Sequence, residues 1–109
     1  MKISIQQIAP RLGDLNFNFE QHLKAIEKAL DNGIELIVFP ELSLTGYLLK
    51  DMVAQVAISA DDPRLSELAG LSRRGISILA GLVEHSRGHL FYNSAFYFEC
   101  GELLHRHRK

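Results

Sequence analysis

One carboxylate, Glu41, lies at the end of the most apolar stretch of this sequence. A nearly continuous apolar run over residues 34–39 predicts a buried strand before it, and Thr45 with Gly46 predicts a turn after it. Pro40 cannot donate to a neighbouring strand, so we expect pairing to stop there. Open α/β sheets bind ligands beyond the carboxyl ends of their strands. Among apolar neighbours the pKa of Glu41 should be raised, which suits a proton shuttle; the plainer alternative is an exposed loop glutamate.

A second group of candidates is the basic run HRHRK at residues 105–109. Alternate side chains of a strand share a face, so the two histidines and Lys109 should lie on one face and the two arginines on the other. Two histidines at this spacing can bind zinc, but no third ligand is evident and Lys109 would repel a cation. We therefore interpret this run as a surface strand and expect no metal site.

Other reactive side chains receive plainer interpretations. Cys100 lies in a turn, outside any strand-to-helix junction that would present a nucleophile, and we expect an ordinary cysteine there. His85 and His89 flank another turn, where solvated side chains are expected. Tyr47 is a candidate for lining a pocket near Glu41, although packing within the turn would explain it equally well.

Hydrophobic periodicity and turn residues predict the elements that must position these groups. In chain order they are a strand at 3–8, a helix from about Asn16 to Gly33 capped by Asn16 or Asn18, a strand at 34–39, a helix at 63–74, and strands at 76–83, 90–98 and from 103 onward. Residues 48–58 are apolar and fit either a loop or a short helix.

The order β-α-β-α-β-β-β predicts an α/β layered fold with helices packed on a sheet and right-handed crossovers. The closing hairpin makes this sheet mixed instead of purely parallel. A doubly wound nucleotide-binding domain of the flavodoxin-like kind would share the early rhythm. The sequence has no Gly-rich or acidic phosphate-binding pattern after its first strand, which counts against that alternative.

Composition excludes several classes of protein. The chain has 109 residues, 47% hydrophobic residues, a net charge of −1 and one cysteine. It is therefore expected to form one domain or part of one, without an internal disulfide and without nucleic acid or membrane as a partner. The absence of a signal-peptide pattern and of a long apolar run predicts a soluble cytoplasmic protein. A last strand that stops on five basic or titratable residues indicates a fragment.

The motifs together resemble the carbon–nitrogen hydrolase, or nitrilase, superfamily. FPELSLTGY at residues 39–47 resembles the family's glutamate motif, and the final HRHRK resembles its lysine motif. GDL at 13–15 and YNSA at 92–95 are similar to the supporting frame. The resemblance covers essentially the whole sequence, so we expect residues 1–109 to be the N-terminal portion of a single domain. It implies an α/β fold that is the N-terminal part of a four-layer α-β-β-α sandwich with a mixed sheet.

The resemblance also implies a Glu-Lys-Cys catalytic set without metal or organic cofactor. Glu41 matches the general base, and Lys109 matches the lysine that stabilises the oxyanion. The family's nucleophilic cysteine follows the lysine, and Cys100, which precedes it, is no substitute. The chain should therefore carry two of three catalytic groups and be inactive alone. A homo-oligomer is expected for the full-length form.

The leading hypothesis is a hydrolase of non-peptide carbon–nitrogen bonds that acts on a small amide, carbamoyl compound or nitrile through a thioester. LTGYLLKDM at residues 44–52 is similar to the glutaminase domain of glutamine-dependent NAD synthetases, with Asp51 in the matching place. That similarity makes glutamine a more specific alternative. A truncated, non-catalytic binding or assembly module is the remaining one.

Overall fold

The computed structural model describes residues 1–47, 53–88 and 90–109. Within these ranges five strands form one sheet, in which they lie in sequence order. The strands are β1 (Ile3–Ile5), β2 (Leu36–Val38), β3 (Ser77–Ser86), β4 (Leu90–Glu99) and β5 (Glu102–Arg108). β1, β2 and β3 pair in parallel, whereas β3, β4 and β5 pair antiparallel, which confirms the predicted mixed sheet.

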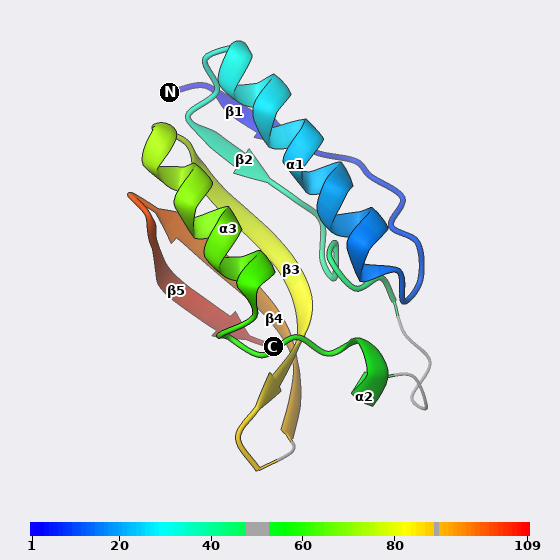
Figure 1. Cartoon of the computed structure of the whole chain (residues 1–109). Coiled ribbons are helices and arrows are strands. Elements are labelled where there is room, and N and C mark those ends of the chain that lie inside the picture. The colour runs from blue at the N-terminus through cyan, green and yellow to red at the C-terminus, as the bar shows by residue number, and fades with distance from the viewer. Residues whose placement is uncertain (48–52, 89) are drawn as a thin grey trace.

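Two helices, α1 (Leu15–Asp31) and α3 (Pro63–Leu71), cover the same face of the sheet (Figure 1). The 3-10 turn η2 (Ser72–Arg74) extends α3 and ends at Gly75, whose φ of 90° suits glycine. Residues 48–58 were expected to form either a loop or a short helix, and the described part of this segment contains the short helix α2 (Val53–Val56). The predicted order of strands and longer helices is confirmed, and the described residues contain no helix long and apolar enough to cross a membrane.

The cap of α1 differs from the prediction. Asp14, and neither Asn16 nor Asn18, is the N-cap, and its side chain accepts a hydrogen bond from the Phe17 amide at 3.1 Å. Asn18 does not cap the helix; its side chain is buried and hydrogen-bonds backbone atoms of two loops. Its Nδ2 donates to the carbonyl oxygens of Arg11 (2.8 Å) and of Leu44 in the loop that carries Glu41 (3.0 Å).

The hairpin from β3 to β4 also differs. Residues 85–89 were predicted as a turn, but β3 continues through Glu84 and His85 to Ser86. The reason is that the polar side chains have partners: Glu84 is buried among arginines, and His85 is half-buried and stacks on Phe91 at a centroid distance of 5.2 Å. His89 lies outside the described residues.

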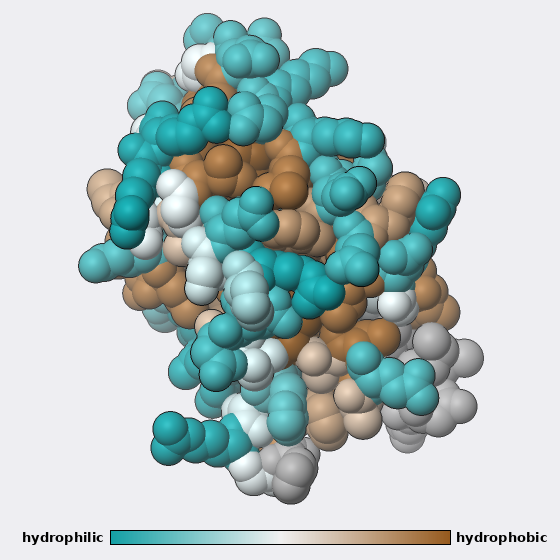
Figure 2. All heavy atoms as spheres, in the orientation of Figure 1, coloured by the Kyte–Doolittle hydropathy of each residue, from teal (hydrophilic) through white to brown (hydrophobic). Residues whose placement is uncertain are grey.

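The core lies between the sheet and the two long helices. Its fully buried members include Ile26, Ile37, Leu68, Ile76, Ile78, Leu82, Phe96 and Phe98. On the helix side hydrophilic side chains predominate at the surface, with smaller apolar areas between them (Figure 2). On the opposite side no described element packs on the sheet, and Ile3 and Ile5 are 53% and 76% exposed. One helix layer and one sheet layer of the expected four are thus present.

Candidate active site

A tight loop over residues 40–46 follows β2 and carries Glu41. The Phe39 amide still pairs with the Leu79 carbonyl oxygen at 2.9 Å, and the chain turns after Pro40, as predicted. Leu42 takes a left-handed φ of 54°, a conformation that costs a non-glycine residue on the order of 1 kcal/mol or more, and buries its side chain. The Leu44 amide bonds the carbonyl oxygen of Gly81 at 2.8 Å, which docks the loop on β3.

Gly81 permits this docking because it has no side chain. A Cβ at this position would lie 2.5 Å from the Leu42 nitrogen and 2.8 Å from the Pro40 oxygen. Both atoms belong to backbone, so neither could turn away as the end of a flexible side chain would. The glycine therefore sets how closely the loop with Glu41 approaches β3.

A buried histidine supports the loop from beneath. His22 of α1 has no exposed surface; its Nδ1 lies 2.6 Å from the Asn18 carbonyl oxygen and its Nε2 lies 2.8 Å from Ser43 Oγ. Its ring is 4.1 Å from that of Phe39. Burial lowers the pKa of His22 from 6.5 to about 4, although the hydrogen bond with Asn18 opposes the change. The imidazole is therefore neutral at neutral pH. Nothing in its spacing predicted this role.

Three side chains converge on Glu41, two from distant parts of the sequence and one, Tyr47, from six positions further along the chain. Asn93 Nδ2 of β4 donates to Oε1 at 2.6 Å, and Lys109 Nζ lies 3.2 Å from the same oxygen. Tyr47 Oη donates to Oε2 at 3.1 Å. The Lys109 amide also bonds the Asn93 carbonyl oxygen at 2.9 Å, which continues the pairing of β4 with β5. The predicted candidates Glu41, Lys109 and Tyr47 are thus brought together.

The expected environment of Glu41 is wrong. Its apolar neighbours Phe39, Leu42 and Leu44 turn into the core, whereas the Glu41 side chain turns outward and is 40% exposed. The pKa of Glu41 is lowered, chiefly by the hydrogen bond from Asn93, then by those from Lys109 and Tyr47 and by the Lys109 charge. The carboxylate is therefore ionised at neutral pH and can accept a proton.

A pocket of about 460 Å³ opens beside Glu41 on the sheet face that the helices leave uncovered. Its lining includes Phe39, Glu41, Leu79, Asn93, His107 and Lys109. His107 and Lys109 share this pocket, while Arg106 and Arg108 reach Glu84 on the other face, which confirms the predicted alternation along β5. Tyr47 touches Glu41 but is 68% exposed and lies outside the lining.

The lone cysteine lies far from this cluster. Cys100 is exposed in the β4–β5 turn, where its φ of 53° and the 87° of Gly101 form a tight two-residue hairpin. The strand from Asn93 to Cys100 spans roughly 20 Å at ~3.3 Å per residue. Its thiol therefore cannot approach Glu41 or Lys109 in this fold. The described residues also contain no group of three histidine, cysteine or acidic side chains arranged to hold a metal ion.

Sequence reasoning missed Asn93, although it lies within the YNSA motif. A polar pair, Asn93 and Ser94, in the middle of a largely apolar and aromatic strand was the available signal, and the β4–β5 register places Asn93 beside Lys109. Asp51, which was matched to glutaminase domains, lies outside the described residues.

Known proteins of related sequence cover most or all of this chain. A glutamine-dependent NAD(+) synthetase from Thermotoga maritima is 31% identical over the whole chain, which covers 19% of that protein. An (R)-stereoselective amidase from Pseudomonas is 34% identical over 87% of the chain and 34% of its own length. The chain thus spans about a third of one of these relatives and about a fifth of the other.

Solved structures share the fold of this chain. The crystal structure of an amidase from Nesterenkonia superposes with a TM-score of 0.83 at 30% identity, over all of this chain and 42% of that one. A variant of the amidase from Nesterenkonia sp. AN1, whose structure is 29% identical over all of this chain, carries the acetamide moiety of fluoroacetamide, covalently added at its active-site cysteine. The model of the carbon-nitrogen hydrolase family matches residues 2–109. This chain therefore belongs to the carbon-nitrogen hydrolase family.

Proposed function

We propose that this chain supplies the general base and the oxyanion-stabilising cation of an enzyme that hydrolyses non-peptide carbon–nitrogen bonds. The observation that carries the proposal is the contact between Glu41 Oε1 and Lys109 Nζ, which joins residues 68 positions apart at the rim of a 460 Å³ pocket. The substrate would be a small amide, carbamoyl compound or nitrile. Membership of the family supports hydrolytic chemistry of this kind.

In the proposed reaction a cysteine thiol gives its proton to the Glu41 carboxylate and attacks the substrate carbonyl carbon. The Lys109 ammonium stabilises the oxyanion that forms as the carbonyl double bond opens. Glu41 then returns the proton to the departing amine, which leaves a thioester. Water, deprotonated by Glu41, hydrolyses that thioester to the acid and restores the thiol. Asn93 and Tyr47 hold the Glu41 carboxylate ionised for the first proton transfer.

The nucleophile in this proposal is a cysteine outside residues 1–109, and the chain is the N-terminal portion of one catalytic domain. Cys100 is excluded by its position in the hairpin turn. Residues 1–109 by themselves are then inactive. We further propose a cytoplasmic homo-oligomer that needs no metal or organic cofactor; the one cysteine within residues 1–109 is free, which suits a reducing compartment.

The test is release of ammonia or amine from a panel of small amides and nitriles by the full-length protein. Glu41→Gln should abolish turnover without unfolding the protein, because only the ability to accept a proton changes. Lys109→Ala should lower kcat by roughly 10²–10³-fold, as loss of an oxyanion donor does. Cys100→Ala should leave turnover unchanged.

Glu20→Gln, on the exposed side of α1, is a matched control for loss of one carboxylate. Near-normal turnover of the Glu41→Gln variant would refute the assignment of the base. A folded wild-type protein that hydrolyses nothing in the panel would instead favour a non-catalytic binding or assembly module.

A glutaminase is the second candidate, because a glutamine-dependent NAD(+) synthetase is 31% identical over the whole chain. The same Glu41 and Lys109 would then act on the side-chain amide of glutamine and release ammonia. Including glutamine in the panel separates the two candidates. A kcat/KM for glutamine far above that for simple aliphatic amides would favour the glutaminase.

A further inference from the structure

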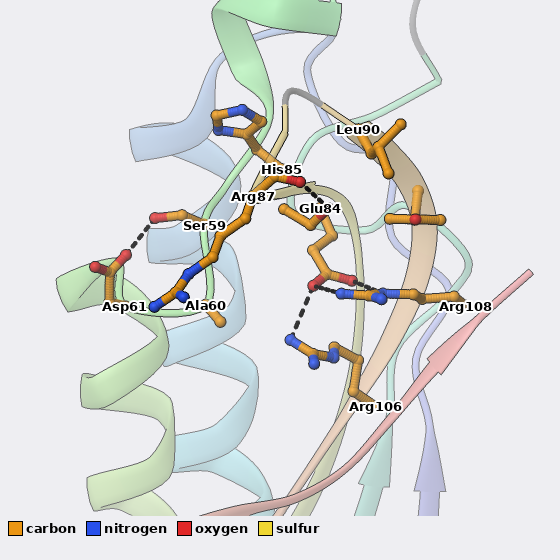
Figure 3. A pocket seen from close by; sticks show the side chains of 11 residues that line it. Ser59, Ala60, Asp61, Glu84, His85, Arg87, Leu90, Arg106 and Arg108 are labelled. Atoms are coloured by element: carbon orange, nitrogen blue, oxygen red, sulfur yellow. Dashed lines mark hydrogen bonds and ion pairs between the residues drawn. The ribbon is translucent and has the colours of Figure 1, made fainter.

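A second carboxylate, Glu84 of β3, is buried on the helix side of the sheet and has no part in the proposed chemistry. Its side chain is 1% exposed. Arg108 donates to it through Nε at 3.0 Å and Nη2 at 2.9 Å, and Arg106 Nη1 lies at 2.9 Å. Ser94 Oγ adds a fourth hydrogen bond at 2.8 Å. Figure 3 shows both arginines reaching from β5 toward Glu84, beside a pocket of about 860 Å³.

These contacts make Glu84 a rigid anchor. Burial by itself raises the pKa of Glu84, but the hydrogen bonds from Arg108 and Ser94 and the two guanidinium charges outweigh it, so its pKa is lowered. The carboxylate therefore stays charged at neutral pH. Its two-point contact with Arg108 constrains direction as well as distance, because both groups are planar.

The strand that Glu84 holds otherwise has little support. β5 lies at the edge of the sheet, pairs with β4 alone among the described strands, and is exposed at most positions. Its pairing with β4 is irregular between Tyr97 and Phe98. A slip by one residue would move every side chain of β5 to the opposite face. Among the described residues, Arg106 and Arg108 are the side chains of β5 that hydrogen-bond to β3, both through Glu84.

The anchor is directly coupled to Lys109. Arg108 pairs with Ser94 and precedes Lys109, whose amide bonds the Asn93 carbonyl oxygen at 2.9 Å. Because neighbouring side chains of a strand point to opposite faces, fixing Arg108 against Glu84 directs Lys109 toward Glu41. Lys109 has little packing of its own there, since its side chain is 74% exposed.

We propose that Glu84 is a positioning residue: through Arg106 and Arg108 it holds the end of β5 in the register that brings the Lys109 ammonium to Glu41. The inference deepens the proposed function and rests on it for the catalytic meaning of that contact. The contact itself can be measured without any substrate, so the two proposals fail separately.

The test is titration of the Glu41 carboxyl by NMR in the full-length protein and its variants. Lys109→Ala should raise the pKa of Glu41, because a hydrogen bond and a positive charge are lost. Glu84→Gln should also raise it if Lys109 is released. A direct electrostatic effect of removing Glu84 has the opposite sign, because losing a nearby negative charge lowers the pKa of another acid.

Combining Glu84→Gln with Lys109→Ala should raise the pKa of Glu41 no further than Lys109→Ala alone does, because both substitutions act through the contact between Lys109 and Glu41. Arg108→Lys conserves charge but loses the two-point contact, so it should raise the pKa of Glu41 even if Glu84→Gln fails to fold. Glu27→Gln is the control: it breaks the Arg74–Glu27 pair, which is half-exposed on the helix side, and should leave the pKa of Glu41 unchanged.

An unchanged or lowered pKa of Glu41 in folded Glu84→Gln and Arg108→Lys variants would overturn the proposal. A rise that persists in full on the Lys109→Ala background would also overturn it, since Lys109 would then not be the link. If the pKa behaves as expected but Lys109→Ala leaves hydrolysis intact, the positioning role stands and the proposed function fails.

Discussion

Mild acid is expected to destabilise this fold through His22. The imidazole is fully buried, and burial lowers its pKa from 6.5 to about 4. In the unfolded chain the ring takes up a proton below about pH 6.5, whereas in the folded chain it stays neutral down to about pH 4. A protonated ring would have N–H groups on both sides, so the Ser43 hydroxyl could no longer donate to Nε2.

The sign and size of the effect follow from these two values. The stabilisation is fully present above pH 6.5 and is lost as the pH falls toward 4, because the unfolded state binds the additional proton in that window. The gap between 6.5 and about 4 corresponds to about 3 kcal/mol, of which about 2 kcal/mol should be lost between pH 7 and pH 5. Glu41, Glu84 and Asp61 change the dependence of stability on pH mainly below pH 5, because their pKa values are lowered from ordinary values of 4.5 or less.

The assay is urea unfolding at pH 7, 6 and 5 at constant ionic strength, followed by circular dichroism. His22→Gln should reduce the dependence of the unfolding free energy on pH, whatever it does to stability at pH 7. His105→Gln, on the exposed β5, is the matched control and should keep that dependence. A wild-type unfolding free energy that is flat between pH 7 and pH 5, or a His22→Gln variant that keeps the wild-type slope, would refute the reasoning.

Two further predictions concern the loop and its carboxylate. Gly81→Ala should destabilise the protein by roughly 1–3 kcal/mol in urea unfolding and displace the loop, because the new Cβ meets backbone at 2.5 Å. The control is Gly70→Ala in α3, whose new Cβ meets nothing within 4 Å; this substitution should stabilise the protein by about 0.5–1 kcal/mol. Equal effects of the two substitutions would contradict the close approach. Asn93→Ala should raise the pKa of Glu41 in an NMR titration and move the acidic limb of the pH–rate profile upward, since the largest cause of its lowering is removed. An unmoved pKa would show that Asn93 does not hold the carboxylate.

Much of this protein is determined locally by the sequence. The helical spacing of Phe19 and Ile26, the turn residues and the apolar runs were enough to predict the order of the elements, because each depends on a few neighbouring residues. The position of Glu41 after β2 followed from Pro40, which cannot pair. The division of β5 into a face with Lys109 and a face with the arginines followed from the period of a strand.

Only the tertiary structure decided what surrounds those side chains. Glu41 was expected among apolar neighbours with a raised pKa, but its partners Asn93 and Lys109 lie 52 and 68 positions away and lower it. The burial of His22 and Glu84 is likewise set by contacts with distant segments. A pKa reflects every charge and hydrogen bond within a few ångströms, and the fold, rather than the local pattern, brings those groups into range.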